Sequence, residues 1–405
     1  MHRFIPALLL LLAGCSPPDA ADAFSIDTLT VPAGTDASGP RVSGGGGRPI
    51  VLSWMEPDDT GTTLRYSTFR DGGWTPPQTV VSGKNMFVNW ADMPSVTALA
   101  DDHWVAHWLE MAGPLTYSYH VVMAQSLDAG RSWSAPVKPH TDGTATEHGF
   151  VSVYPDDGKV AAIWLDGRKT GGEHGGDPQA SGMTLRSAVI GADNALYSKQ
   201  EIDGLICDCC QTDVAMTAEG PVAVYRDRTV DEIRDIYLAR HVDGRWQPGA
   251  SLHDDNWRIA GCPVNGPAID ARGSDVAAAW FSVPDQAPAV QIKFSQDSAA
   301  TFGPALKLAA DGALGHVDAV MLEDRSVVVS WLQAAAAGRG QLVLRRVTSG
   351  GEMGPVFDVA SDAAARSVPQ MAIAGDDLVL VWTEARDDGK RIASARVPID
   401  SVAAD

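Results

Sequence analysis

The strongest constraint on the fold is a short pattern that recurs seven times along the chain. Each copy is a run of mostly apolar residues that ends in an aromatic side chain and is followed by a polar loop. The copies are Val51–Trp54, Val105–Trp108, Ala161–Trp164, Val222–Tyr225, Ala277–Trp280, Val328–Trp331 and Val379–Trp382. Their aromatic residues lie 54, 56, 61, 55, 51 and 51 positions apart. This regular spacing indicates one structural unit that is used repeatedly.

Each copy has similar neighbours, which define the unit. A shorter strand precedes it, as at Pro94–Val96, and a longer alternating strand follows it, as at Leu64–Ser67. A fourth segment often follows a Gly-x-Trp turn, as at Trp74. Four strands per repeat predict an all-β fold, a β-propeller of four-stranded antiparallel blades. Seven copies favour seven blades, and six blades with one decayed or extra sheet are the alternative.

The two ends of the repeat array predict how the ring is closed. The last copy ends near Ile399 without a fourth strand, and an extra strand, Phe24–Val31, precedes the first copy. We expect this N-terminal strand to lie on the outer edge of the last blade, where it removes an open sheet edge. Residues 24–405 are therefore expected to form a single propeller domain.

The first residues are typical of an export signal. His2 and Arg3 precede an apolar run, Ala7–Leu12, that is far shorter than the ~20 residues of a membrane-spanning helix. The run ends in Leu-Ala-Gly-Cys, which resembles the lipobox of bacterial lipoproteins. The resemblance implies that residues 1–14 are a signal peptide and that Cys15 is lipidated. The alternative is an ordinary signal peptide with a chance cysteine.

The residues after Cys15 bear on location. Residues 15–23 are polar and contain Pro and Ala, so we expect a tether from the lipid anchor to the propeller. Ser16, rather than an aspartate that would signal inner-membrane retention, follows the cysteine. The expected location is the cell envelope, at the outer membrane, facing the periplasm or the cell surface.

The net charge of −20, with 51 acidic and 31 basic residues, argues against a nucleic-acid partner or an anionic lipid surface. We expect a monomer whose only membrane contact is the lipid anchor. An anionic ligand would need a local basic pocket.

One loop has a recognisable form. Ser126–Trp133 reads S-x-D-x-G-x-x-W and resembles the Asp box of bacterial sialidases and other BNR-repeat proteins, and Ser295–Phe302 is a degenerate second copy. The resemblance implies a turn between the outer strands of a blade, in which Asp and Ser bond the backbone. The arginine motif and the Tyr–Glu pair of true sialidases are not recognisable here, and Tyr117 and Tyr119 are expected to be packing residues. The resemblance therefore implies a sialidase-like propeller without the catalytic set.

In a propeller, the loops that enter the innermost strands share one face with the loops that join the second and third strands. A glycosidase needs two carboxylates at such a face. The candidates are Glu147, Asp166, Asp208 and Asp227, and no spacing singles out a pair.

The same face is expected to carry ligand-binding residues. Arginine forks bind carboxylates, sulfates or phosphates, and structural ion pairs with Asp166, Asp227, Asp231 and Glu384 are the alternative. The candidate ligand-binding residues are Arg168, Arg226, Arg228, Arg366, Arg386, Trp90, His148 and His316.

Four cysteines remain after Cys15, namely Cys207, Cys209, Cys210 and Cys262, and the repeat places them on adjacent blades. In an oxidising compartment the first interpretation is two disulfides, one of which ties Cys262 to the Cys-Asp-Cys-Cys segment. The alternatives are a soft metal ion, Cu(I) or Zn, with His148 or His316 nearby, and simple buried thiols. The segment also resembles a Cys-x-Cys-Cys feature of uncharacterised sialidase-like lipoproteins, which implies no activity.

Three functions follow from these residues. The favoured prediction is a sialidase-like propeller that binds an anionic glycan or a related small ligand, without a claim of hydrolysis. The alternatives are a metal-binding or thiol-redox protein built on the cysteines, and a scaffold that binds another envelope protein. No motif demands a cofactor. His174, in the longest insertion, is expected to be a solvated loop residue.

Overall fold

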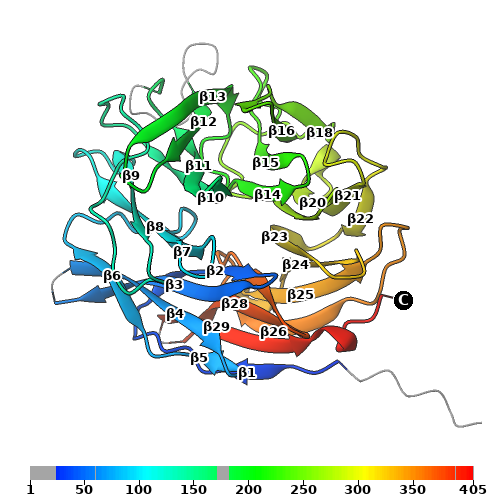
Figure 1. The fold of residues 1–405 in the computed structure, drawn as a ribbon. Coiled ribbons are helices and arrows are strands. Elements are labelled where there is room, and N and C mark those ends of the chain that lie inside the picture. The colour runs from blue at the N-terminus through cyan, green and yellow to red at the C-terminus, as the bar shows by residue number, and fades with distance from the viewer. Residues whose placement is uncertain (1–23, 60, 171–181, 388, 405) are drawn as a thin grey trace, which may run out of the picture.

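The structure, a computed structural model, describes residues 24–59, 61–170, 182–387 and 389–404. The predictions for the signal peptide, the tether, Cys15 and His174 lie outside these residues. Antiparallel sheets are arranged around a common centre, with β7, β10, β14 and β23 innermost and β13 and β18 at the rim (Figure 1). The prediction of an all-β propeller is confirmed. No helix of the described residues is long and apolar enough to cross a membrane.

Three sheets come from the first half of the chain. They are β2 (Ser38–Gly45), β3 (Arg48–Asp58), β4 (Gly61–Arg70), β5 (Gly73–Trp74) and β6 (Gln78–Gly83); β7 (Ser95–Ala98), β8 (Trp104–Met111) and β9 (Tyr119–Ser126); and β10 (His148–Asp156), β11 (Lys159–Asp166), β12 (Met183–Ile190) and β13 (Leu196–Ile206).

The remaining strands form three more sheets. Two are β14 (Asp213–Thr217), β15 (Gly220–Arg226), β16 (Ile236–Val242), β17 (Arg245–Trp246) and β18 (Ala250–His253), and β19 (Ala268–Arg272), β20 (Asp275–Ser282), β21 (Ala289–Ser295) and β22 (Leu306–Ala309). The third is eight-stranded and contains β23 (Ala313–Met321), β24 (Val327–Ala334), β25 (Gly340–Val347), β26 (Phe357–Ala363), β27 (Gln370–Ala374), β28 (Asp377–Arg386), β29 (Gly389–Pro398) and β1 (Asp27–Leu29). Short 3₁₀ turns lie at η1 (Pro284–Gln286), η2 (Ala336–Gly338) and η3 (Ile399–Ser401).

The seven apolar copies all lie in strands that are second from the centre: β3, β8, β11, β15, β20, β24 and β28. These strands are apolar on both faces because a sheet packs against each face. Their tryptophans are buried, and the indole N–H of several is bonded on the same strand. Trp54 donates to Glu56, Trp108 to Glu110 and Trp164 to Asp166, each at 2.8 Å, because residues i and i+2 share a face of a strand.

Neighbouring innermost strands are joined by a second repeated device. A short polar side chain on or beside one strand bonds a backbone group of the next, because backbone N–H and C=O groups near the centre need partners. The links are Ser43 to Val96 O (2.9 Å), Phe150 N to Asp92 (2.7 Å), Ser152 to Thr212 O (2.8 Å), Ile269 N to Asp213 (2.9 Å), Met321 N to Asp270 (2.7 Å), Met371 N to Asp318 (2.6 Å) and Val42 N to Gln370 (3.1 Å). We call them the inter-strand links.

One sheet has fewer than the expected four strands. Among the described residues, the sheet of β7, β8 and β9 has three strands, and beyond β9 there are only isolated bridges, from Val137 to Met123 and from Glu147 to Tyr119. The segment contains Pro136 and Pro139, which have no backbone N–H to give to a ladder. The proline content accounts for the missing fourth strand.

The loop Ser126–Trp133 has the predicted turn chemistry. The Gly130 amide donates to Ser126 Oγ at 2.8 Å, and the Ser132 amide donates to Asp128 Oδ1 at 2.9 Å. The second copy repeats both bonds, from the Ala299 amide to Ser295 at 3.0 Å and from Thr301 to Asp297 at 2.8 Å. The two loops are therefore built alike.

The link at Asp92 generates a test of pH dependence. Its carboxyl group is 1 % exposed and accepts bonds from the Phe150 amide and the Tyr119 hydroxyl. Burial, with a smaller contribution from the charge of Glu147, raises the pKa of Asp92 to about 7. Because this folded pKa lies above the unfolded value of about 3.9, the stability from protonated Asp92 is complete below about pH 4 and is lost as the pH rises to about 7.

Asp92→Asn keeps the shape of the side chain and does not ionise. Relative to wild type, we expect its free energy of unfolding to rise by up to ~4 kcal/mol between about pH 4 and pH 8, measured by urea denaturation. Asp101→Asn, at an exposed carboxylate, is the control and should show no such trend. A difference between Asp92→Asn and wild type that is constant over this range would contradict the role assigned to Asp92.

Candidate functional site

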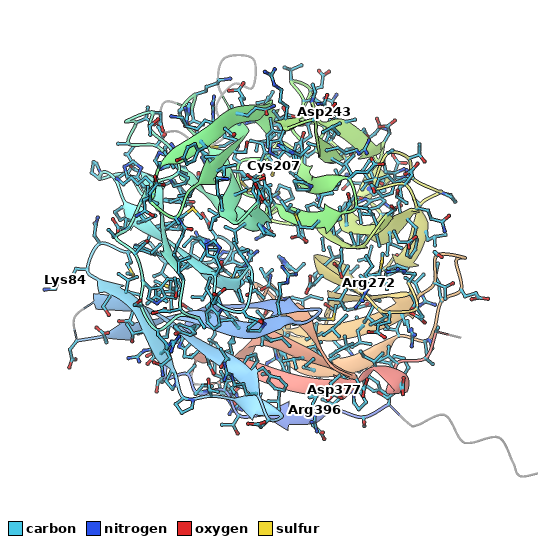
Figure 2. All side chains as sticks on the ribbon, in the orientation of Figure 1. Lys84, Cys207, Asp243, Arg272, Asp377 and Arg396 are labelled. Carbon is cyan, nitrogen blue, oxygen red and sulfur yellow. The ribbon has the colours of Figure 1, made fainter. Side chains whose placement is uncertain are left out.

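Three of the four cysteines lie in one turn that faces the centre. Cys207, Cys209 and Cys210 connect β13 to β14 and are buried, and Cys262 is exposed. The turn is held to the neighbouring sheet by a hydrogen bond of 3.0 Å from the Cys207 amide to Arg226 O. Figure 2 shows Cys207 set in from the rim, whereas Asp243 lies at the outer edge.

The structure corrects the disulfide interpretation of these cysteines. All four are free thiols, and the Cys207 and Cys209 sulfurs are 4.0 Å apart, compared with about 2.05 Å in a disulfide. The sulfurs of Cys207, Cys209 and Cys210 lie within 4.8 Å of one another. Consecutive residues of a tight turn thus bring three thiols together without bonding them. The predicted histidine neighbours are not part of this group.

The pKa of one of the three thiols is shifted in the opposite direction to the other two. Burial opposes ionisation of Cys207, but hydrogen bonds from Cys209 and Cys210 and the charge of Arg234 outweigh it and hold the pKa of Cys207 well below its usual value. The Arg234 guanidinium donates to Cys207 Sγ at 3.5 Å. The bonds to Cys207 raise the pKa of Cys209, and burial raises the pKa of Cys210. The surroundings of the cluster therefore favour ionisation of Cys207 over that of Cys209 and Cys210.

Two of the predicted ligand-binding arginines support this turn instead of facing a ligand. Arg226 is 1 % exposed and donates to three backbone oxygens, Asn265 O (2.9 Å), Arg234 O (2.6 Å) and Phe281 O (2.6 Å). Its guanidinium also lies 4.8 Å from the ring centre of Trp257. Arg228 is buried between Glu232 (2.6 Å) and the candidate catalytic residue Asp208 (3.3 Å).

The arginines of two other loops are paired with carboxylates. Arg168 binds the candidate catalytic residue Asp166 through two nitrogens, at 2.6 and 2.7 Å. Arg386 is 3.0 Å from Glu384, and Arg391 approaches the same carboxylate. Arg168 and Arg386 therefore form structural ion pairs, which was the alternative to ligand binding. Asp227, another candidate, is buried, and burial together with the charge of Asp203 raises its pKa to about 7.

Arg366 differs from the other four, because it is exposed and no carboxylate of the described residues pairs with it. Its guanidinium lies 5.7 Å from the ring centre of Trp90. Trp90 is partly exposed, contacts the His316 ring at 5.8 Å and packs against the core that contains the cysteines. His316 also lines a central cavity of about 230 Å³, together with Arg41, Asp213 and Asp318. Three predicted ligand-binding residues therefore meet at one side of the centre.

The fourth catalytic candidate, Glu147, belongs to a buried trio. The Tyr119 hydroxyl lies 2.5 Å from Glu147 and 2.8 Å from Asp92. A phenol has one proton for these two acceptors, and burial, together with both carboxylates, raises the pKa of Tyr119 well above its usual value. Tyr119 is 1 % exposed and stacks on Phe87. The prediction that it is a packing residue agrees with this burial.

A second group of metal-ligating side chains combines two predicted site residues with three that the sequence analysis did not single out. His120, His140 and His148 approach one another within 4.8 Å, and so do Asp142, His148 and Asp166. Only His148 and Asp166 were predicted to be site residues. His120 is on β9, and His140 and Asp142 lie in the loop before β10; the signal that could have found them is three histidines, together with Asp142, within residues 120–148.

The comparisons with known proteins bear on the fold and do not define an activity. A Dyadobacter fermentans protein of unknown function is 14% identical, with a TM-score of 0.52, covering 93% of this chain and 100% of that chain. A mutant NanB sialidase from Streptococcus pneumoniae has 8% identity, a TM-score of 0.49 and coverages of 93% and 95%. Trypanosoma rangeli sialidase has 12% identity, a TM-score of 0.45 and coverages of 81% and 56%.

No protein-family model and no curated protein matches the chain. The Dyadobacter protein supports the fold alone. The two sialidases, with TM-scores below 0.5, add no argument about the chemistry of this chain. Function must therefore be argued from the side chains.

The environment of Arg226 predicts a structural role. Arg226→Met removes three hydrogen bonds and leaves their carbonyl oxygens buried without donors, each of which costs ~1–3 kcal/mol. We expect a loss of at least ~3 kcal/mol in the free energy of unfolding, measured by chemical denaturation. The matched control is Arg366→Met, at an exposed arginine, with an expected change within ~0.5 kcal/mol. Equal stability of the two variants would overturn the assignment.

Proposed function

We propose that this protein binds a soft metal ion, Cu(I) or Zn(II), through Cys207, Cys209 and Cys210. The observation that carries the proposal is that three buried sulfurs lie within 4.8 Å of one another with no disulfide between them. Thiolates are the ligands that soft ions prefer. A tetrahedral site with Zn–S bonds of ~2.3 Å places its sulfurs about 3.8 Å apart, and Cys207 and Cys209 are 4.0 Å apart.

The charges around the turn also favour a bound thiolate cluster. Three thiolates and one cation leave a net negative charge, which needs compensation in a buried place. Arg234 donates a hydrogen bond to Cys207. The hydrogen-bond partners of Arg226 are neutral carbonyl groups, so its charge is not compensated by them. That charge acts to lower the pKa of Cys210, although burial has the larger effect and raises it. Cys262 is close enough to Cys209 to raise the pKa of that thiol, so it is the natural fourth ligand.

The test is a titration of the reduced full chain with Cu(I) under anaerobic conditions, with thiol counting. We expect one tightly bound equivalent that protects the thiols and releases protons, because metal binding requires thiolates. Cys207→Ser with Cys210→Ser should abolish this equivalent. The matched control, His253→Gln, changes a partly exposed histidine on the rim strand β18 and should retain it. Unchanged stoichiometry in the double variant would refute the proposal. So would a chain that shows no free thiol even after reduction.

A second candidate function rests on Trp90, Arg366 and His316. We infer that this side of the centre binds an acidic sugar. The partly exposed indole of Trp90 offers a surface on which a sugar ring can stack, and the guanidinium of Arg366 can pair with a carboxylate. No hydrolysis is proposed, because Asp166, Asp208 and Glu147 are each bound to an arginine or a tyrosine.

For this second candidate, binding of a uronic acid or sialic acid is compared with that of a neutral hexose by calorimetry. We expect Arg366→Met to weaken binding of the acidic sugar by about tenfold or more, the loss of one charge-assisted contact. Arg386→Met, at an arginine already paired with Glu384, is the control with little change. The candidate fails if the acidic and neutral sugars bind alike, or if both variants behave as wild type.

We also propose that the ring has seven blades. This count is supported by the links between seven innermost strands and by the pairing of β1 with β29 (Asp27 with Arg396). The eight-stranded sheet then contains two blades, whose strands are paired in the described residues at Ala363 and Glu384 alone. Residues 24–405 as one domain, export and attachment through Cys15 remain proposals from the sequence.

A further inference from the structure

A second cluster of ligand-type side chains lies away from the cysteine turn. His120 is on β9, His140 and Asp142 are in the loop before β10, and His148 begins β10 opposite Asp166 of β11. The rings of His140 and His148 are stacked, with centres 3.7 Å apart and 6° between their planes. The His120 ring lies 4.9 Å from the first and 5.6 Å from the second.

The hydrogen bonds of two histidines fix which ring nitrogen carries the proton. His140 Nδ1 is 3.0 Å from Asp142 Oδ1, and His148 Nδ1 is 3.1 Å from the Thr146 carbonyl oxygen. Both partners accept, so each Nδ1 is the donor and each Nε2 of a neutral ring has a free lone pair. A histidine held by its second nitrogen to a carboxylate or carbonyl is the usual arrangement of a metal ligand.

Three buried ring nitrogens of this cluster have no hydrogen-bond partner. They are His120 Nδ1, His140 Nε2 and His148 Nε2, and the side chains of His140 and His148 are almost fully buried. A buried polar atom without a partner costs free energy, and an ion or water is the common explanation. His148 Nε2 faces Asp142 Oδ2 at 3.2 Å and Asp166 Oδ2 at 3.6 Å, without the geometry of a hydrogen bond.

The donor atoms of the cluster are of two kinds. The unpartnered ring nitrogens of the histidines lie beside the Asp142 carboxylate, which is also 3.4 Å from Arg168. Imidazole nitrogens beside a carboxylate are the donor set of a borderline divalent ion.

We propose that His120, His140 and His148 bind a divalent transition-metal ion of the Zn(II) class, with Asp142 as the carboxylate that positions His140. Imidazole nitrogen suits such ions, in contrast to the thiolates of the cysteine turn. Asp166 supports the site from outside, since Arg168 and Trp164 already occupy its oxygens. Zn–N bonds of ~2.0–2.1 Å need ring nitrogens about 3.4 Å apart, and the nitrogens here lie within 4.8 Å before any ion draws them together.

The site is accessible from the surface. His120 is only partly buried, and His140 lines a small pocket that also contains Arg168, Arg186 and Lys199. Three protein ligands leave a coordination position for water or another ligand. A ligand bound there would meet Arg168, Arg186 and Lys199 together with Glu201, which is paired with Arg186.

The experiment uses the full chain with Cys207, Cys209 and Cys210 changed to Ser, so that the thiolate site does not contribute. We expect it to bind one equivalent of Zn(II), and Co(II) to give d–d bands without a sulfur charge-transfer band. His120→Gln, at the partly exposed ligand, should weaken Zn(II) binding by at least ~10-fold, and His253→Gln should not change it. Circular dichroism and urea denaturation without metal establish that each variant is folded.

Two results would overturn this inference. One is a folded cysteine variant that binds no Zn(II), and the other is a His120→Gln variant that binds as tightly as its parent. The histidine site does not depend on the cysteine proposal. The Cu(I) titration measures binding to the cysteine thiolates, whereas the Zn(II) titration of the cysteine variant measures binding to the histidines. Loss of one binding event with retention of the other distinguishes the two failures.

Discussion

The inter-strand links near the centre are the constraint on which the rest of the structure depends. Sheets that radiate from a centre cannot form continuous ladders with one another, so backbone groups of the innermost strands must find partners elsewhere. Short side chains supply them, from Ser43 to Gln370. Several are carboxyl groups whose pKa burial raises, as at Asp92 and Asp318, both to about 7. The centre is therefore held by polar side chains in a place from which water is partly excluded.

This arrangement determines where chemistry can be placed. The loops that enter the innermost strands are anchored by the links on one side and by the apolar second strands on the other. The cysteine turn lies directly before Asp213, which links β14 to Ile269, and the histidine loop ends at β10, whose Ser152 links to Thr212. Both candidate metal sites thus sit on backbone that tertiary contacts hold in place, as a preorganised site requires.

The sequence predicted the architecture from apolar periodicity, because burial between two sheets demands a continuous apolar run wherever it occurs. Val51–Trp54 and its six counterparts all lie in such strands, and the loop at Asp128 has its predicted bonds. The disulfide interpretation was wrong because cysteine spacing does not reveal the direction of each Sγ. Arg226 and Arg228 were grouped with ligand-binding residues because their partners, carbonyls of distant loops and Glu232, cannot be read from the repeat. His120 and His140 were missed, although three histidines, together with Asp142, lie within residues 120–148.

The pairing of β1 with β29 has a consequence for how the chain reaches this structure. The ion pair between Asp27 and Arg396 joins residues 369 positions apart. Closing a loop of this length costs conformational entropy before the contact can stabilise the fold. Contacts between residues so far apart in sequence therefore slow folding. During synthesis, β1 emerges before the other described strands and has no partner until β29 is made. Residue 27 must therefore remain available, uncleaved and unaggregated, while the strands between β1 and β29 are being made.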